Sequence, residues 1–139
     1  MAKTLNIKCI KVFKASALRI PIFAIIMQSE LVAKWQQVVQ KIQQDFNKTP
    51  DVNAILFLIG MREFGMPRAK FTKEEKVELM HIAVCRLLST SGFYELEGID
   101  KDGWPHWKST KKLPNIDMLQ QETFLRQHII EYFESEGLL

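Results

Sequence analysis

Two segments of the chain are apolar on nearly all sides, and they constrain the fold more than any other feature. The first covers residues 51–65 and reads DVNAILFLIGMREFG; the second covers residues 77–88 and contains few strongly polar side chains. Helices that are apolar around most of their circumference are covered on several sides in a folded protein. A chain of 139 residues is long enough to close one core around them. We therefore expect the two segments to pack against each other as central helices.

Capping signals mark the ends of these helices. Thr72 followed by Glu75 is a capping box, in which the hydroxyl and the carboxylate each accept from a backbone N–H of the first turn. Thr49 and Pro50 predict an N-cap and a first helical residue, because proline at that position loses no hydrogen bond. A buried strand over residues 54–59 is the alternative, but the caps, the length and Gly65 as a stop favour a helix. The expected helices are residues 50–64 and 73–90.

Amphipathic helices are predicted on either side of this pair. Ser29 can cap a helix over residues 29–46, and Asp117 with Gln120 opens one over residues 117–135. Apolar residues recur in both at steps of three and four, which predicts one buried stripe on each. The expected stripes are Leu31, Trp35, Val38, Val39, Ile42 and Phe46 in the first helix, and Met118, Leu125, Ile129, Tyr132 and Phe133 in the second.

A β-hairpin is predicted at about residues 93–108. Asp100-Lys101-Asp102-Gly103 is a strong turn signal, because aspartate starts a type I turn and glycine takes the positive φ that closes it. The fold class is therefore mainly α: a compact four-helix domain with one hairpin inserted before the last helix. A four-residue loop pairs Ile99 with Trp104, Glu97 with His106, Leu96 with Trp107 and Glu95 with Lys108, although a bulge would shift this register.

This register gives the hairpin two different faces. Tyr94, Leu96, Pro105 and Trp107 would lie on the helices, with the polar side chains on the other face and Trp104 near the tip. In one interpretation the polar residues are cross-strand pairs and the tryptophans cover the core. In the other, the polar face binds a polar ligand or a basic peptide of a partner. The candidate binding surface consists of Glu95, Glu97, Asp100, Asp102, Trp104 and His106.

A metal or acid–base site is the competing hypothesis. Glu78, His81 and Cys85 follow i, i+3, i+7 spacing and can point in one direction from a helix, and His128 with Glu131 could add ligands from the last helix. Dimetal bundles use the Glu-x-x-His fragment twice, together with further glutamates, so the ligand set is incomplete here. We expect His81 to be a core histidine and Cys85 to be a buried, inert thiol. No cofactor is expected.

Residues 1–26 differ from the rest of the chain. They contain five cations and no acid, while the whole chain has a net charge of +3, so the remainder is slightly acidic. Clustered basic residues of the kind that neutralise phosphates are missing there, which argues against nucleic acid as a partner. The apolar run in this segment is too short to span a bilayer. It is interpreted as upstream sequence before a start at Met27, a degenerate signal, a transit peptide or a membrane-surface segment, with little folded structure.

The chain resembles a known family in three runs: DVNAILFLIG, KEEKVELMHIAVCRLLS and YELEGIDKDGWPHW. From Met27 onward the chain resembles a family of small uncharacterised bacterial proteins. The resemblance implies no activity, and no site residue is carried over. The two cysteines, Cys9 and Cys85, form no disulfide framework, which is typical of a cytoplasmic protein. We therefore expect a protein-interaction or structural domain that binds a protein or a second copy; the alternative is a metal-binding or acid–base enzyme using His81 or His106.

Overall fold

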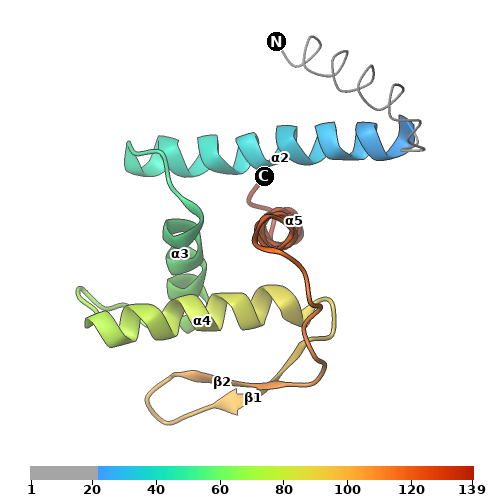
Figure 1. Cartoon of the computed structure of the whole chain (residues 1–139). Helices are drawn as coiled ribbons and strands as arrows, with labels where there is room; N and C mark the ends of the chain where they lie inside the picture. Colours follow the sequence, from blue (N-terminus) through green and yellow to red (C-terminus); the bar gives the residue numbers. More distant parts are fainter. Residues whose placement is uncertain (1–21) are drawn as a thin grey trace. The chain divides into compact units, whose positions relative to one another are not determined.

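The computed structural model describes residues 22–139, and the predictions for residues 1–21 lie outside this range. The element order confirms the predicted fold class, a mainly helical domain with one hairpin before the last helix (Figure 1). The elements are α2 (Ile22–Phe46), α3 (Val52–Phe64), α4 (Lys73–Ser89), β1 (Tyr94–Ile99), β2 (Pro105–Ser109) and α5 (Met118–Ser135). Residues 35–139 form one compact unit, which contains the C-terminal part of α2 and all later elements.

The helix α2 begins earlier than predicted. It starts at Ile22, so Ser29 lies inside the helix and is not its N-cap. The expectation of little folded structure before residue 27 is therefore wrong for the first turn of α2. In its C-terminal half, Val38 and Ile42 are buried as predicted, whereas Phe46 is 57% exposed. Phe46 is the last residue of the helix and lies beyond the buried part of its stripe. A start at Met27 stays a prediction.

The N-cap of α3 also differs from the prediction. Asp51, rather than Thr49, adopts the extended cap conformation, and its carboxylate accepts a hydrogen bond from the backbone N–H of Ala54 at 2.8 Å. Pro50 therefore lies outside the helix. Aspartate is a better N-cap than threonine, so the cap forms at Asp51, two residues after Thr49. At the other end, Gly65 has a φ of +71° and stops the helix as predicted.

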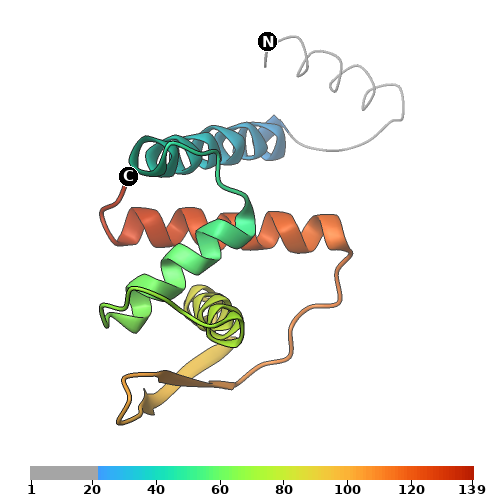
Figure 2. The same cartoon turned by 90° about the vertical axis from the view of Figure 1, so that its left-hand side faces the viewer.

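The helices α3 and α4 cross and form the centre of the core (Figure 2). Ile55 and Leu79 are fully buried, and the two apolar segments shield each other as predicted. The two backbones lie close together at Gly60, where an added β-carbon would lie 2.1 Å from the backbone oxygen of Leu79. No larger residue fits there without moving a helix.

The start of α4 follows the prediction. Thr72 and Glu75 form both hydrogen bonds of the capping box. The backbone N–H of Thr72 and the guanidinium of Arg68 hold the pKa of the Glu75 carboxyl below its usual range. This end of α4 is therefore fixed by a local network that includes the preceding loop.

The last helix covers another side of α4. The capping box of Asp117 and Gln120 is present. Within α5, Ile129, Tyr132 and Phe133 are buried as predicted, while Met118 is 85% exposed, contrary to the prediction. Met118 is the first residue of α5, ahead of the part of the helix that carries the buried side chains. The hairpin lies on the opposite side of α4 from α5 in both views (Figures 1 and 2).

Candidate functional site

The tip of the hairpin is organised by one carboxylate. Oδ1 of Asp100 accepts hydrogen bonds from the backbone N–H groups of Asp102 and Trp104, at 2.9 and 3.0 Å. Its other oxygen lies 2.8 Å from Nε2 of His106, and Gly103 has the expected positive φ of +89°. The His106 hydrogen bond and the two backbone hydrogen bonds lower the pKa of Asp100. The predicted turn is confirmed, and two of the candidate site residues are joined by it.

The register differs from the prediction near the tip. Glu95 pairs with Lys108 and Leu96 with Trp107 as predicted, but Gly98 rather than Glu97 lies opposite His106. The reason lies in the turn. It includes Trp104, whose carbonyl accepts from the backbone N–H of Asp100 at 3.0 Å, so the loop is longer than predicted. A bulge between Leu96 and Gly98 compensates for the additional loop residue and restores the register beyond it.

Trp104 does not point into solvent beside the acidic residues. Its ring stacks on Phe64 of α3, with a centroid distance of 4.3 Å and an angle of 29° between the rings. Pro105 is buried and Trp107 half-buried, as predicted for the face on the helices, while Leu96 is 46% exposed, contrary to the prediction. The aromatic residues therefore anchor the hairpin to the core.

The acidic residues of the candidate surface are all exposed. Glu95, Glu97, Asp102 and His106 are exposed alongside Asp100. Among residues 22–139, neither Glu95 nor Glu97 has a hydrogen-bond or ion-pair partner, and Lys108 makes no ion pair with the glutamate opposite it. The hairpin thus presents two unpaired carboxylates on a base fixed by aromatic packing. Whether these residues bind a partner stays a prediction.

The predicted metal ligands on α4 do not converge. Nε2 of His81 lies 3.5 Å from Sγ of Cys85, but within the described part of the chain no three His, Cys, Asp or Glu side chains are placed to hold a metal ion. Burial raises the pKa of the Cys85 thiol to about 11, and the Glu78 carboxylate acts in the same direction. Such a thiol is a poor nucleophile at neutral pH.

His81 is not the core histidine that the sequence suggested. It is exposed, with its ring edge-on to Tyr94. The buried histidine is His128 on α5, which is 5% exposed. Its Nδ1 lies 2.8 Å from the carbonyl oxygen of Phe124 and its Nε2 2.7 Å from the hydroxyl of Ser91. Because a carbonyl only accepts, Nδ1 carries the proton, and the histidine ties α5 to the turn before β1.

Comparison of the chain with protein-family models, with curated proteins and with solved structures finds no significant match. The resemblance to a family of small bacterial proteins stays a prediction. None of the helices between residues 22 and 139 has the length and apolar character needed to cross a bilayer. The geometry of the site is therefore the basis for the functional argument.

Sequence reasoning missed a polar cluster that joins α3, α4 and α5. The hydroxyl of Tyr132 donates to Glu63 at 2.7 Å and accepts from Arg62 at 2.7 Å, while Arg62 also reaches Glu136 at 2.6 Å. Nε of Arg86 lies 3.2 Å from Glu63. Burial and the Glu63 hydrogen bond raise the pKa of Tyr132 to about 12. The members satisfy one another, so the cluster is a structural connection. The sequence feature that could have indicated this cluster is Arg86, a charged side chain in a mostly apolar helix.

Proposed function

We propose that the chain is a small cytoplasmic protein-interaction domain whose hairpin binds a basic segment of a protein partner or of a second copy. The observation that carries the proposal is the pair of unpaired, exposed carboxylates of Glu95 and Glu97. Leu96 and Ile99 of the same strand are 46% and 67% exposed, but they pair with Trp107 and Pro105 on the opposite face of the hairpin. Cationic side chains are the complement of the two carboxylates.

Rigidity supports the same interpretation. Trp104 and Pro105 hold one side of the hairpin on the core, and Thr110 closes its base through hydrogen bonds to the backbone of Phe93 and Gly92. A surface fixed in advance loses less conformational entropy when it binds. The backbone that carries the acidic residues is therefore held in place before a partner binds.

A random peptide library selected against the immobilised full-length chain tests the proposal. We expect selected peptides rich in lysine and arginine. Glu95→Gln with Glu97→Gln should weaken the selected peptides by roughly twofold to thirtyfold, because exposed ion pairs contribute about 0.2–1 kcal/mol each. The matched control, Glu74→Gln with Glu131→Gln, removes the same charge from the exposed surface of α4 and α5.

Two outcomes would contradict the proposal. One is that the selected peptides are not enriched in lysine and arginine. The other is an equal loss of peptide affinity in the hairpin variant and in the control variant, because the loss would then follow from the net charge of the protein and not from the hairpin. In either case the hairpin is a cover for the helical core only. Since neither Glu95 nor Glu97 has a partner within residues 22–139, a loss of binding in the first variant is not explained by unfolding.

A further inference from the structure

The outer face of α3 is apolar and incompletely covered. Its inner stripe, including Ile55 and Ile59, is buried against α4. The opposite stripe follows the same i, i+3, i+4, i+7 spacing and consists of Ala54, Phe57, Leu58 and Met61, of which the alanine is exposed and the other three are half-buried. A helix that is apolar on all sides is normally covered on all sides. Among the described residues, the second stripe is therefore a surface without an intramolecular partner of sufficient size.

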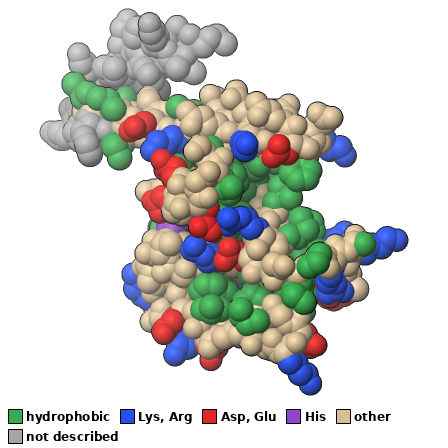
Figure 3. Space-filling view, turned by 180° about the vertical axis from the view of Figure 1, so that it is seen from behind, with side chains coloured by type: hydrophobic (Ala, Val, Ile, Leu, Met, Phe, Trp, Pro, Cys, Tyr) green, Lys and Arg blue, Asp and Glu red, His purple; other side chains and the backbone are tan. Residues whose placement is uncertain are grey.

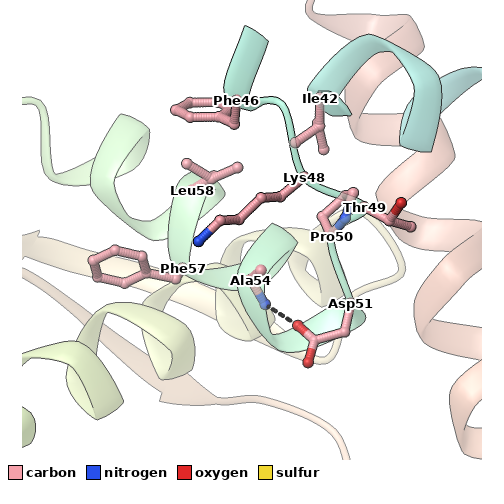
Figure 4. Close-up of a pocket in the computed structure, with 9 residues that line it drawn as sticks. All are labelled: Ile42, Phe46, Lys48, Thr49, Pro50, Asp51, Ala54, Phe57 and Leu58. Atoms are coloured by element: carbon pink, nitrogen blue, oxygen red, sulfur yellow. Dashed lines mark hydrogen bonds between the residues drawn. The ribbon is translucent and has the colours of Figure 1, made fainter. Parts of the chain in front are cut away.

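Three hollows run along this stripe. The first, of about 410 Å³, lies between the end of α2 and α3 and is lined by Phe46, Phe57 and Leu58 among others (Figure 4). The second, of about 370 Å³, shares Phe57 with the first and continues to Met61 and Phe71. The third, of about 340 Å³, shares Met61 and Phe71 with the second. The three hollows follow one another along α3 and share lining residues. Their apolar lining is called here the α3 groove: Phe46, Ala54, Phe57, Leu58, Met61 and Phe71.

The border of the α3 groove is basic. Lys48 lines the first hollow, and Figure 4 shows its side chain reaching over it toward Phe57 and Leu58. Lys70 and Lys76 line the second. Within residues 22–139 none of these three lysines has an ion-pair partner. The one acid lining these hollows is Asp51, whose carboxylate already caps α3.

The space-filling view agrees with this description. Figure 3 shows hydrophobic side chains gathered in a band on the side of the molecule where α3 lies, with lysine and arginine side chains beside it. Arg68 also lies at the border, but its guanidinium is paired with Glu75 and stacks on Phe71 at 5.0 Å. The uncompensated charge of the border therefore comes from the lysines.

We propose that the α3 groove binds an amphipathic helix of a partner protein that carries acidic residues beside its apolar stripe. The groove follows a helix of 13 residues, or about 20 Å at 1.5 Å per residue, which is the length of a short recognition helix. Helices bind such grooves through apolar residues at i, i+3, i+4 and i+7. Glutamate or aspartate next to those positions would meet Lys48, Lys70 and Lys76.

Charge argues against the other occupants. Residues 1–26 of this chain have five cations and no acid, so the border lysines would repel them. The hairpin of a second copy is acidic, but it is a two-stranded sheet rather than a helix. The proposed site is also separate from the hairpin surface, because it is built from α2, α3, the loop before α4 and the first turn of α4. Failure of one proposal therefore leaves the other intact.

A designed peptide pair tests the proposal on the full-length chain. The probe is a fluorescent helical peptide with leucine and phenylalanine at i, i+3, i+4 and i+7 and glutamate at the flanking positions; the control peptide has the same composition in scrambled order. Binding is measured by fluorescence anisotropy at increasing salt. We expect binding of the probe only, with an affinity that falls as salt screens the lysines.

Two charge-reversal variants locate the site. Lys48→Glu, Lys70→Glu and Lys76→Glu together should weaken the probe by about tenfold or more, since each exposed attraction becomes a repulsion. The control triple, Lys101→Glu, Lys108→Glu and Lys112→Glu, makes the same change of net charge on the hairpin and the connector and should leave binding within about twofold. All six lysines are exposed, so both proteins are expected to fold.

Three results would overturn the proposal. The first is equal binding of the scrambled peptide, and the second is an equal loss in both triple variants. The third is a wild-type protein that sediments as a dimer while the first triple variant sediments as a monomer, because the groove would then be occupied by a second copy of the chain. Phe46→Ala supplies an independent check of the apolar part of the groove. The ring is 57% exposed, so its removal should weaken the probe while leaving the urea midpoint close to that of the wild type.

Discussion

Replacement of Gly60 by alanine tests how the two central helices fit together. In the interior of a helix, alanine is favoured over glycine by about 1 kcal/mol, so an unobstructed site would gain stability. Gly60 is obstructed by backbone. The new β-carbon would lie 2.1 Å from the carbonyl oxygen of Leu79 and 2.6 Å from its carbonyl carbon, whereas such contacts are essentially never shorter than 3.0 Å. The substitution therefore requires α3 and α4 to separate by about an ångström.

The separation disturbs fully buried residues of the core. Ile55, Ile59 and Leu79 are at most 2% exposed, and the contacts among the inner residues weaken as the helices move apart. Overpacking a core costs about 1–3 kcal/mol, and an obstacle made of backbone places Gly60→Ala at the upper end. After the gain in helix propensity, we expect a net loss of about 2 kcal/mol, or roughly 10 °C in Tm.

Urea unfolding followed by far-UV circular dichroism measures this loss as a lower midpoint. Ala54→Gly, on the exposed side of the same helix, gives the propensity difference without the contact. Unchanged or increased stability of Gly60→Ala would refute the close approach of the two backbones.

Two further predictions concern the hairpin and the buried thiol. Trp104→Ala should lower the free energy of unfolding by about 2 kcal/mol, because the ring stacked on Phe64 is lost. The control Leu96→Ala, at a 46% exposed position, should change it by less than about 0.5 kcal/mol. Equal urea midpoints for the two variants would contradict the packing role of Trp104. Cys85 should resist iodoacetamide at neutral pH and react only as the pH approaches about 11 or after unfolding, because the raised pKa keeps the thiol protonated below that range. Peptide mass spectrometry follows this cysteine separately from Cys9, and rapid labelling of the folded protein at neutral pH would disprove its burial.

Local signals in the sequence predicted the local structure. The capping boxes at Thr72 and Asp117 and the turn at Asp100 each involve residues within a few positions of one another, and all three are present. Two segments that are apolar on nearly all sides also predicted that α3 and α4 would shield each other. The caps and the turn depend on neighbouring residues alone, so the sequence contains the information needed to find them.

Predictions failed where distant residues decide the outcome. Trp104 was placed beside the acidic residues because nothing nearby indicates that Phe64 is its partner. His81 was interpreted as a core residue because its helix is apolar, while the histidine that is buried, His128, depends on Ser91 in another part of the chain. The half-covered outer face of α3 could not be predicted from the sequence either. A helix that is apolar on all sides has the same sequence whether the fold covers it completely or leaves one stripe open.

The two proposed surfaces share a structural support, and this determines which variants test them. Ring contacts run from Phe57 in the α3 groove through Phe71 and Phe64 to Trp104 in the hairpin, at centroid distances of 6.1, 6.1 and 4.3 Å. Removing any ring of this row disturbs the support of both surfaces together. Aromatic truncations along the row therefore report on stability rather than on recognition. Variants of the unpaired charges, the glutamates of β1 and the lysines of the groove, change one surface at a time because the described fold does not use those charges.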